Sequence, residues 1–249
     1  MENDNLKSVT ESLYKQNLEL AVKNLTFSKK ILGFYDKITL PETLASGIEI
    51  IHPYTTPEVR EYVKKFYNKF FLDTKDRVFV FGINPGRFGS GVTGVPFTDP
   101  VALQEYCGII NVFEKRRELS SQFVYEFIER WGGVCKFYKN FFLTAVSPIG
   151  FIRNGVNYNY YADPAFFSSI KPFIIDTIKT QLNFGVRRDM VIILGTGKNQ
   201  KIFNDINREY GFFKKIYALE HPRFIMQYRR KHLKKYLRKY EQIFSQAIS

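Results

Sequence analysis

Apolar residues follow two spacings along the chain, and these spacings predict both strands and helices. Four short apolar runs, rich in β-branched and aromatic residues, are typical of buried strands; they cover residues 78–81, 141–146, 190–194 and 215–219. Helical spacing predicts helices over residues 6–32, 56–71, 121–131, 165–183, 199–210 and 226–247. Because strands alternate with helices, the pattern indicates a parallel sheet that is covered on both faces.

This order of elements predicts an α/β fold, a three-layer α/β/α arrangement with a four-stranded, mainly parallel central sheet. A chain of 249 residues is long enough for one large domain or two small ones. No internal repeat or low-complexity linker divides it. We therefore expect a single domain over residues 1–249, with a core over 46–249 and a helical extension over 1–45.

The loop after the first predicted strand has a composition that suits ligand binding. It reads Gly-Ile-Asn-Pro-Gly-Arg-Phe-Gly over residues 82–89. Glycine permits positive φ and lets a ligand approach the backbone closely. Asn84 lies at the carboxyl end of the strand, where open α/β sheets bind their ligands. Asparagine before proline is also a common turn former, so a purely structural role is the alternative.

The loops after the other predicted strands carry further candidate residues. They contain Ser147-Pro148, the Gly-Thr-Gly-Lys segment that ends at Lys198, and His221-Pro222. In a parallel sheet all these loops leave the same edge, which predicts an active-site rim there. A single histidine near a strand end is more often structural than catalytic. The segment ending at Lys198 suits a phosphate at a helix N-terminus, but it lacks the spacing of a P-loop.

Charge adds a partner to this picture. The net charge is +13, which favours a polyanionic partner, and a nucleic acid more than a membrane. The alternative is a basic protein that has no such partner. Residues 222–240 carry no acid and eight basic side chains: Arg223, Arg229, Arg230, Lys231, Lys234, Lys235, Arg238 and Lys239. Surface helices normally mix charges of both signs, so this run indicates phosphate contacts, with a solvated helix face as the alternative.

Composition also excludes several classes of protein. Two cysteines, Cys107 and Cys135, cannot form a four-thiolate zinc site or ligate an iron–sulfur cluster. No cluster of His, Cys, Asp and Glu has ligand spacing, so we expect neither a metal nor another cofactor. The first residues do not resemble a signal peptide, and no apolar run is long enough to span a bilayer. We expect a cytoplasmic protein.

Two segments together carry a family resemblance. Residues 82–89, with Thr-Gly-Val-Pro-Phe at 93–97, closely resemble the first motif of the single-strand-selective monofunctional uracil-DNA glycosylases, which belong to the uracil-DNA glycosylase superfamily. The second motif of that superfamily begins with His-Pro after the last strand, as His221-Pro222 does here. The first motif is specific and the second is weak alone, but both occur in the family's order. The resemblance covers roughly residues 48–240.

The resemblance implies a role for each matching residue. Asn84 corresponds to the asparagine that positions the attacking water, and Phe97 to the ring that stacks on the extruded base. Gly86 lies where the loop backbone contacts that base, and His221 corresponds to the histidine that stabilises negative charge on the departing base. Residues 223–230 occupy the position of the wedge that fills the gap left in the DNA helix.

Two segments depart from the family's pattern. The family's His-Pro-Ser-Pro is His221-Pro222-Arg223-Phe224 here, so the wedge differs. After the second strand the family has an asparagine that reads the pyrimidine edge, and this chain has Ala145. Alanine makes no side-chain hydrogen bond, so Ser147, Thr144 or backbone groups are left to contact the base edge. We therefore expect weak or broadened selectivity for uracil, with xanthine and hypoxanthine as alternative substrates.

These observations predict a monofunctional DNA glycosylase that acts on uracil or a related deaminated base in base-excision repair. A base inside a duplex must be flipped out or supplied in a single strand, and 17% aromatic residues leave rings for stacking on it. We expect a monomer, associated with the nucleoid, whose partner is damaged DNA and not a membrane. The DNA-binding candidates are Arg223, Arg229, Arg230, Lys231, Lys234 and Lys198. An inactive DNA-binding protein of the same fold and a nucleotide-binding enzyme are the alternatives.

Overall fold

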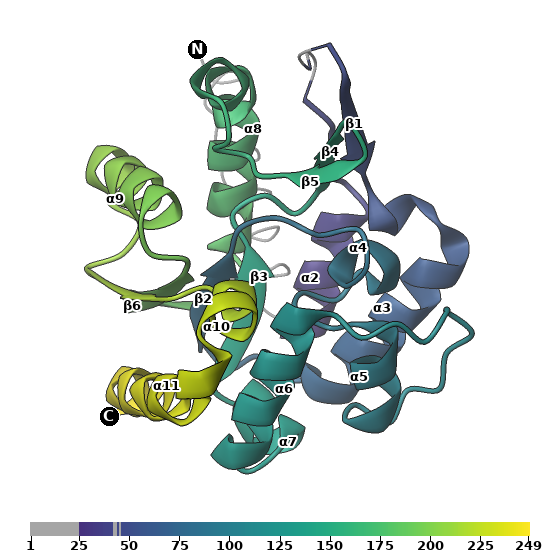
Figure 1. Cartoon of the computed structure of the whole chain (residues 1–249), viewed down its shortest axis with the longest axis vertical. Coiled ribbons are helices and arrows are strands. Elements are labelled where there is room, and N and C mark those ends of the chain that lie inside the picture. The colour runs from purple at the N-terminus through teal and green to yellow at the C-terminus, as the bar shows by residue number, and fades with distance from the viewer. Residues whose placement is uncertain (1–24, 42–43, 45) are drawn as a thin grey trace, which may run out of the picture.

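The computed structural model of the protein describes residues 25–41, 44 and 46–249. Its centre is a parallel four-stranded sheet with the strand order β3-β2-β6-β7 (Figure 1). The strands are β2 (Arg77–Gly82), β3 (Phe141–Ala145), β6 (Val186–Leu194) and β7 (Lys215–Leu219). Strand β2 is buried at every position, as expected for an inner strand of a sheet covered on both faces. The predicted fold class and its four strands are confirmed.

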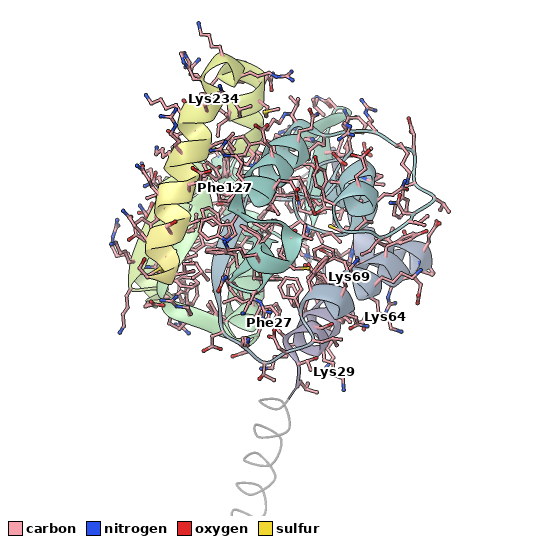
Figure 2. All side chains as sticks on the ribbon, turned by 90° about the horizontal axis from the view of Figure 1, so that it is seen from below. Phe27, Lys29, Lys64, Lys69, Phe127 and Lys234 are labelled. Carbon is pink, nitrogen blue, oxygen red and sulfur yellow. The ribbon has the colours of Figure 1, made fainter. Side chains whose placement is uncertain are left out.

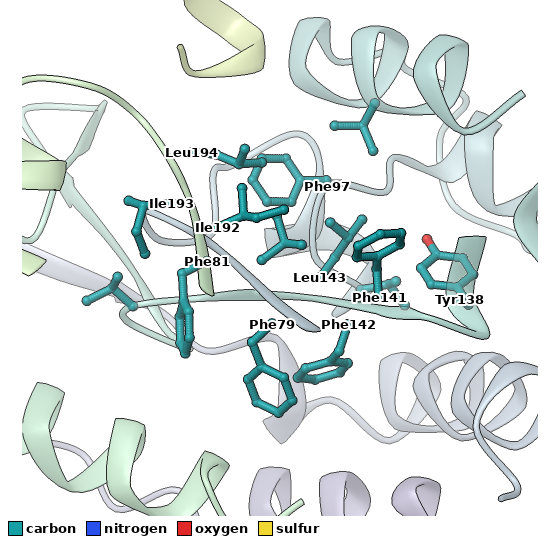
Figure 3. Close-up of a cluster of buried hydrophobic side chains, with 14 of the residues drawn as sticks. Phe79, Phe81, Phe97, Tyr138, Phe141, Phe142, Leu143, Ile192, Ile193 and Leu194 are labelled. Carbon is teal, nitrogen blue, oxygen red and sulfur yellow. The ribbon is translucent and has the colours of Figure 1, made fainter. Parts of the chain in front are cut away.

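Helices form the two outer layers. One face of the sheet, which presents Phe79, Phe81 and Phe142, is covered by α2 (Phe27–Tyr35), α3 (Pro57–Phe70), α8 (Pro164–Gln181) and α9 (Lys198–Tyr210). The opposite face, which presents Phe141, is covered by α6 (Leu119–Trp131), α7 (Val134–Tyr138) and α11 (Leu233–Ile248). Figure 3 shows this alternation, with Phe79 and Phe142 below the strands and Leu143 and Phe97 above them.

Several short elements have too few residues to show a period in the sequence, and the sequence did not predict them. A second, antiparallel sheet has the order β1-β4-β5, formed by β1 (Ile48–Ile51), β4 (Gly150–Arg153) and β5 (Val156–Tyr158). The other elements are η1 (Pro53–Thr55), α4 (Ser90–Thr93), α5 (Pro100–Glu105), α10 (Pro222–Tyr228) and η2 (Arg230–His232). The single helix predicted over 226–247 was wrong, since α10, η2 and α11 divide that segment.

The N-terminal region contributes to the core where the structure describes it. The helix predicted over residues 6–32 lies mostly outside the described residues, and α2 begins at Phe27. Phe27 and Ile31 are fully buried, and the ring of Phe27 contacts the rings of Phe79 and Phe142. In Figure 2 the Phe27 side chain points into the molecule, whereas Lys29 points outward. Residues 27–35 therefore pack on the sheet, while the division at residue 45 stays a prediction.

A buried arginine joins α2 to the start of β2. The side chain of Arg77 has no exposed surface, and its guanidinium lies 4.7 Å from the ring centre of Phe27 and 4.8 Å from that of Phe71. It donates hydrogen bonds to both carboxylate oxygens of Asp73, each at 2.9 Å, and to the carbonyl of Tyr138 at 2.7 Å. A buried cation is tolerated because these acceptors and rings replace its hydration.

We expect Arg77→Met to destabilise the fold. The substitution keeps the apolar stem but removes the guanidinium donors from Asp73, which keeps only the N–H of Lys75, and from the Tyr138 carbonyl, a loss of about 3 kcal/mol. Urea unfolding followed by circular dichroism measures this loss. The matched control is Arg208→Met, which removes an exposed ion pair to Asp205 and is expected to change stability by less than about 1 kcal/mol. Equal stability of the two variants would contradict the role given to Arg77.

Candidate active site

A cavity of about 450 Å³ opens at the carboxyl ends of β2 and β3. This volume lies in the range of small-molecule sites, roughly 300–1,000 Å³. Six candidates from the sequence line it, namely Asn84, Gly86, Phe97, Ala145, His221 and Arg223. The loops after β2, β3 and β7 thus meet at one sheet edge, as the parallel topology requires. The Gly-Thr-Gly-Lys loop after β6 does not line the cavity.

The carboxamide of Asn84 is fixed by the segment that follows β5. Its Oδ1 accepts the backbone N–H of Tyr160 at 3.1 Å, and its Nδ2 donates to the carbonyls of Tyr158 and Pro85, each at 3.3 Å. A carbonyl oxygen has two lone pairs, so Oδ1 retains one for another donor such as a water molecule. Asn84 is therefore a positioned acceptor and not a mobile side chain.

Phe97 forms an aromatic wall of the cavity and lies against the end of β2. A Cβ atom on Gly82 would lie 2.5 Å from Cζ of Phe97, so glycine is required for this approach. Phe97 itself has a φ of 56°, in the left-handed region that side chains rarely adopt. Figure 3 shows its ring above the strands, on the side of the sheet where Leu143 also lies. The result is a fixed flat surface for a planar ligand.

His221 lies across from this ring, with ring centroids 5.9 Å apart. It is the N-cap of α10, and its Nδ1 accepts the backbone N–H of Arg223 at 3.2 Å. An accepting Nδ1 places the proton of the neutral imidazole on Nε2. Burial, and then the positive charge of Arg223, lower the pKa of His221 from 6.5 to about 4. At neutral pH His221 is therefore an uncharged hydrogen-bond donor through Nε2.

Two polar residues of the cavity have no local sequence signal. Glu118 is the N-cap of α6. Its backbone N–H donates to Oδ2 of Asp99 at 2.8 Å, and its side-chain Oε1 accepts a hydrogen bond from the Ser120 hydroxyl at 3.0 Å. Burial raises the pKa of Glu118, although the Ser120 hydrogen bond and the charge of Arg223 act in the opposite direction. Asn157, on β5, accepts the N–H of Arg87 at 3.1 Å and so ties β5 to the glycine-rich loop.

The other candidates lie outside the cavity or have their polar group bonded elsewhere. Ser147 is fully buried and donates its hydroxyl to the carbonyl of Ile149 at 2.7 Å, so the expectation that it contacts a base has no support from its position. Thr144 lines the cavity, but its hydroxyl donates to Gln181 at 2.5 Å. The basic candidates Lys198, Arg229, Arg230, Lys231 and Lys234 are exposed and lie outside the cavity. Figure 2 shows Lys234 on the outer surface, near one end of α11.

In the part of the chain that the structure describes, no three or more His, Cys, Asp or Glu side chains are grouped as a metal ion would require. None of the helices described there combines the length and the apolar character needed to cross a membrane.

Comparisons with known proteins agree with this geometry. Residues 70–245 match the family described as the uracil DNA glycosylase superfamily. A similar solved structure is the wild-type SMUG2 crystal structure from Pedobacter heparinus, which is 42% identical to this chain. The match covers 88% of this chain and 97% of that one, with a TM-score of 0.85. No curated protein matches the chain.

We expect the imidazole of His221 to stay neutral to low pH, with an NMR titration midpoint at about pH 4. Because folding lowers this pKa, the unfolded chain gains a proton between about pH 6.5 and 4 that the folded chain does not, so this residue makes stability fall as pH drops through that window. The variant His221→Gln removes this component of the stability profile. A midpoint near 6.5 would contradict the burial and charge effects described for this site.

Proposed function

The chain belongs to the uracil DNA glycosylase superfamily, and we propose that its cavity holds a deaminated base, uracil among them, that has been flipped out of DNA. The predicted resemblance to the single-strand-selective monofunctional branch is confirmed, and so is the prediction of a DNA glycosylase, a hydrolase of DNA repair. The inactive and nucleotide-binding alternatives have no better support. The observation that carries the proposal is that Phe97, His221 and Asn84 line one cavity.

The first step of the proposed mechanism is binding of the flipped base. The base stacks on Phe97, whose ring is held against Gly82. Stacking offsets part of the cost of removing the base from the helix, a few kcal/mol. Gly86 also lines the cavity, and its missing side chain lets the loop backbone approach the base.

The second step is heterolysis of the N-glycosidic bond. The bonding electron pair leaves with the base, so negative charge develops on the base carbonyl oxygens and positive charge on the sugar. His221 donates a hydrogen bond from its Nε2–H group to such an oxygen. The low dielectric of the site strengthens this hydrogen bond. A neutral donor requires no proton transfer, which fits the lowered pKa of His221.

The third step is the attack of water on the sugar carbon. Asn84 holds the water through its remaining Oδ1 lone pair, and its three other hydrogen bonds keep that oxygen in place. A carboxamide is not a general base, so it orients the water and does not take its proton. This suits attack on a bond that is already largely broken. The water proton passes to solvent and the departed base anion takes up a proton from solvent, so the products are the free base and an abasic site.

We expect Asn84→Ala and His221→Ala each to lower the rate of excision by about 10²–10³-fold, with nearly unchanged affinity for DNA. Each removes a group that acts mainly in the transition state. Single-turnover kinetics on an oligonucleotide that carries the preferred lesion measure the rate. Asn140→Ala, which alters a carboxamide outside the cavity, is the control. Full activity in both cavity variants would refute the proposed mechanism.

Ala145 leads to a prediction about the target base. It lines the cavity without a polar side chain, so a base edge beside it lacks a partner at a cost of roughly 1–3 kcal/mol, about 10- to 150-fold in selectivity. We expect the protein to excise xanthine or hypoxanthine as well as uracil, and Ala145→Asn to shift its preference toward uracil. Excision rates on matched oligonucleotides test both points. Strict uracil excision that Ala145→Asn does not improve would mean that other groups read the edge.

A further inference from the structure

A second cleft, of about 310 Å³, adjoins the active-site cavity. The two share Gly86, Glu118, Asn157 and Arg223 as lining residues. The cleft is further lined by Arg87, Phe88, Arg116 and Arg117, so four of its lining residues are arginines. The sequence did not identify Arg87, Arg116 or Arg117 as candidates, because they lie outside the basic run at 222–240.

Two of these arginines converge on one aromatic ring. The guanidinium of Arg116 lies 3.5 Å from the ring centre of Phe88, and that of Arg87 lies 4.8 Å from it. The backbone of Arg87 is fixed by Asn157, and its buried Nε has no hydrogen-bond partner. The ring attracts both cations, but it cannot replace the hydrogen bonds that their N–H groups require.

Neighbouring carboxylates compensate the charges in this cleft only in part. Arg117 is paired with Glu105, but Arg87, Arg116 and Arg223 have no ion-pair partner among the described residues. The only acid among the lining residues is Glu118. Holding several cations together on one face costs energy that an anion would recover. Guanidinium groups present paired N–H donors that fit the oxygens of a phosphate.

We propose that this arginine cleft, Arg87, Arg116 and Arg223, binds a backbone phosphate next to the flipped nucleotide, which rests on the glycosylase function proposed above. A base in the cavity brings its sugar and the adjoining phosphates to the cavity mouth, because the strand is continuous. The cleft shares four lining residues with the cavity, so it lies within reach of such a phosphate. A bound phosphate supplies acceptors for the N–H groups of Arg87 and Arg116, and the strand is then held beside the glycine-rich loop.

The test combines a protein variant with a change in the DNA. Arg116→Met is the main variant, because Arg116 is exposed and its side chain has no hydrogen bond among the described residues, so the fold should survive. Arg87→Met is a second variant. The control is Arg153→Met, which also removes an exposed arginine from an aromatic ring, that of Tyr158, but outside both cavities. In a set of oligonucleotides with an abasic site, neutral methylphosphonate replaces one phosphate at a time.

We expect one methylphosphonate beside the abasic site to weaken binding of the unaltered protein by about tenfold, as loss of a charge-assisted contact does. Arg116→Met should weaken binding similarly and become insensitive to that methylphosphonate, while Arg153→Met keeps the sensitivity. For Arg116→Met, the magnitude of the slope of log affinity against log salt should be smaller than for the unaltered protein, by about 0.9 on duplex DNA or 0.7 on a single strand. If the losses from Arg116→Met and from every methylphosphonate simply multiply, the cleft binds no phosphate of the strand.

Two further outcomes separate this proposal from the proposed function. Binding to an abasic product does not require excision. If Arg116→Met and one methylphosphonate are coupled in their effects on binding, but the protein excises no base, the cleft is supported and the proposed function is overturned. Excision without coupling would overturn the cleft alone. Binding of a deoxynucleoside monophosphate is measured in parallel. If Arg116→Met weakens that binding while all methylphosphonates are without effect, the cleft serves a free nucleotide and the proposal is wrong.

Discussion

The contact between the ring of Phe97 and the backbone of Gly82 determines the shape of the active site. Only a residue without Cβ lets the ring come this close to the end of β2. The left-handed backbone of Phe97 costs of order 1–3 kcal/mol, and the surrounding turn must hold it there. The turn does so through Thr93, whose hydroxyl donates to the carbonyl of Thr98 at 2.6 Å. The loop thereby returns to the sheet edge, where Phe97 lines the same cavity as His221.

Strand β2 separates groups that stabilise the fold from groups that line the cavity. At its beginning, Arg77 is buried among aromatic rings, and each of its three guanidinium nitrogens donates a hydrogen bond. Beyond its end, Asn84 and Gly86 line the cavity. The two ends are linked by a strand that is buried at each position, so the cavity rests on a rigid support. A base platform on such a support needs little reordering when it binds, which is how preorganised sites stabilise transition states.

The sequence predicted the parts of this structure that have a local signal. Apolar runs identified the four central strands, and glycine, asparagine and histidine at strand ends identified Gly86, Asn84 and His221. The contacts of Asn157 and Glu118 join segments far apart in the chain, as Asn157 to Arg87 shows at a separation of 70 residues, and no local pattern marks them. Ser147 shows the opposite case: its position after a strand was informative, but its hydroxyl bonds to a carbonyl in its own loop.

The charge that suits DNA binding also limits the chemistry of His221. An imidazolium would be the stronger hydrogen-bond donor to a departing base, but it would have to exist beside Arg223, in a half-buried site. Both burial and that neighbouring charge disfavour the cation, and the N–H of Arg223 occupies Nδ1. A basic surface near the cavity therefore selects a neutral donor. In the proposed mechanism the negative charge on the base is then stabilised by a fixed dipole and not by proton transfer, so the placement of Nε2 matters more than the basicity of the ring.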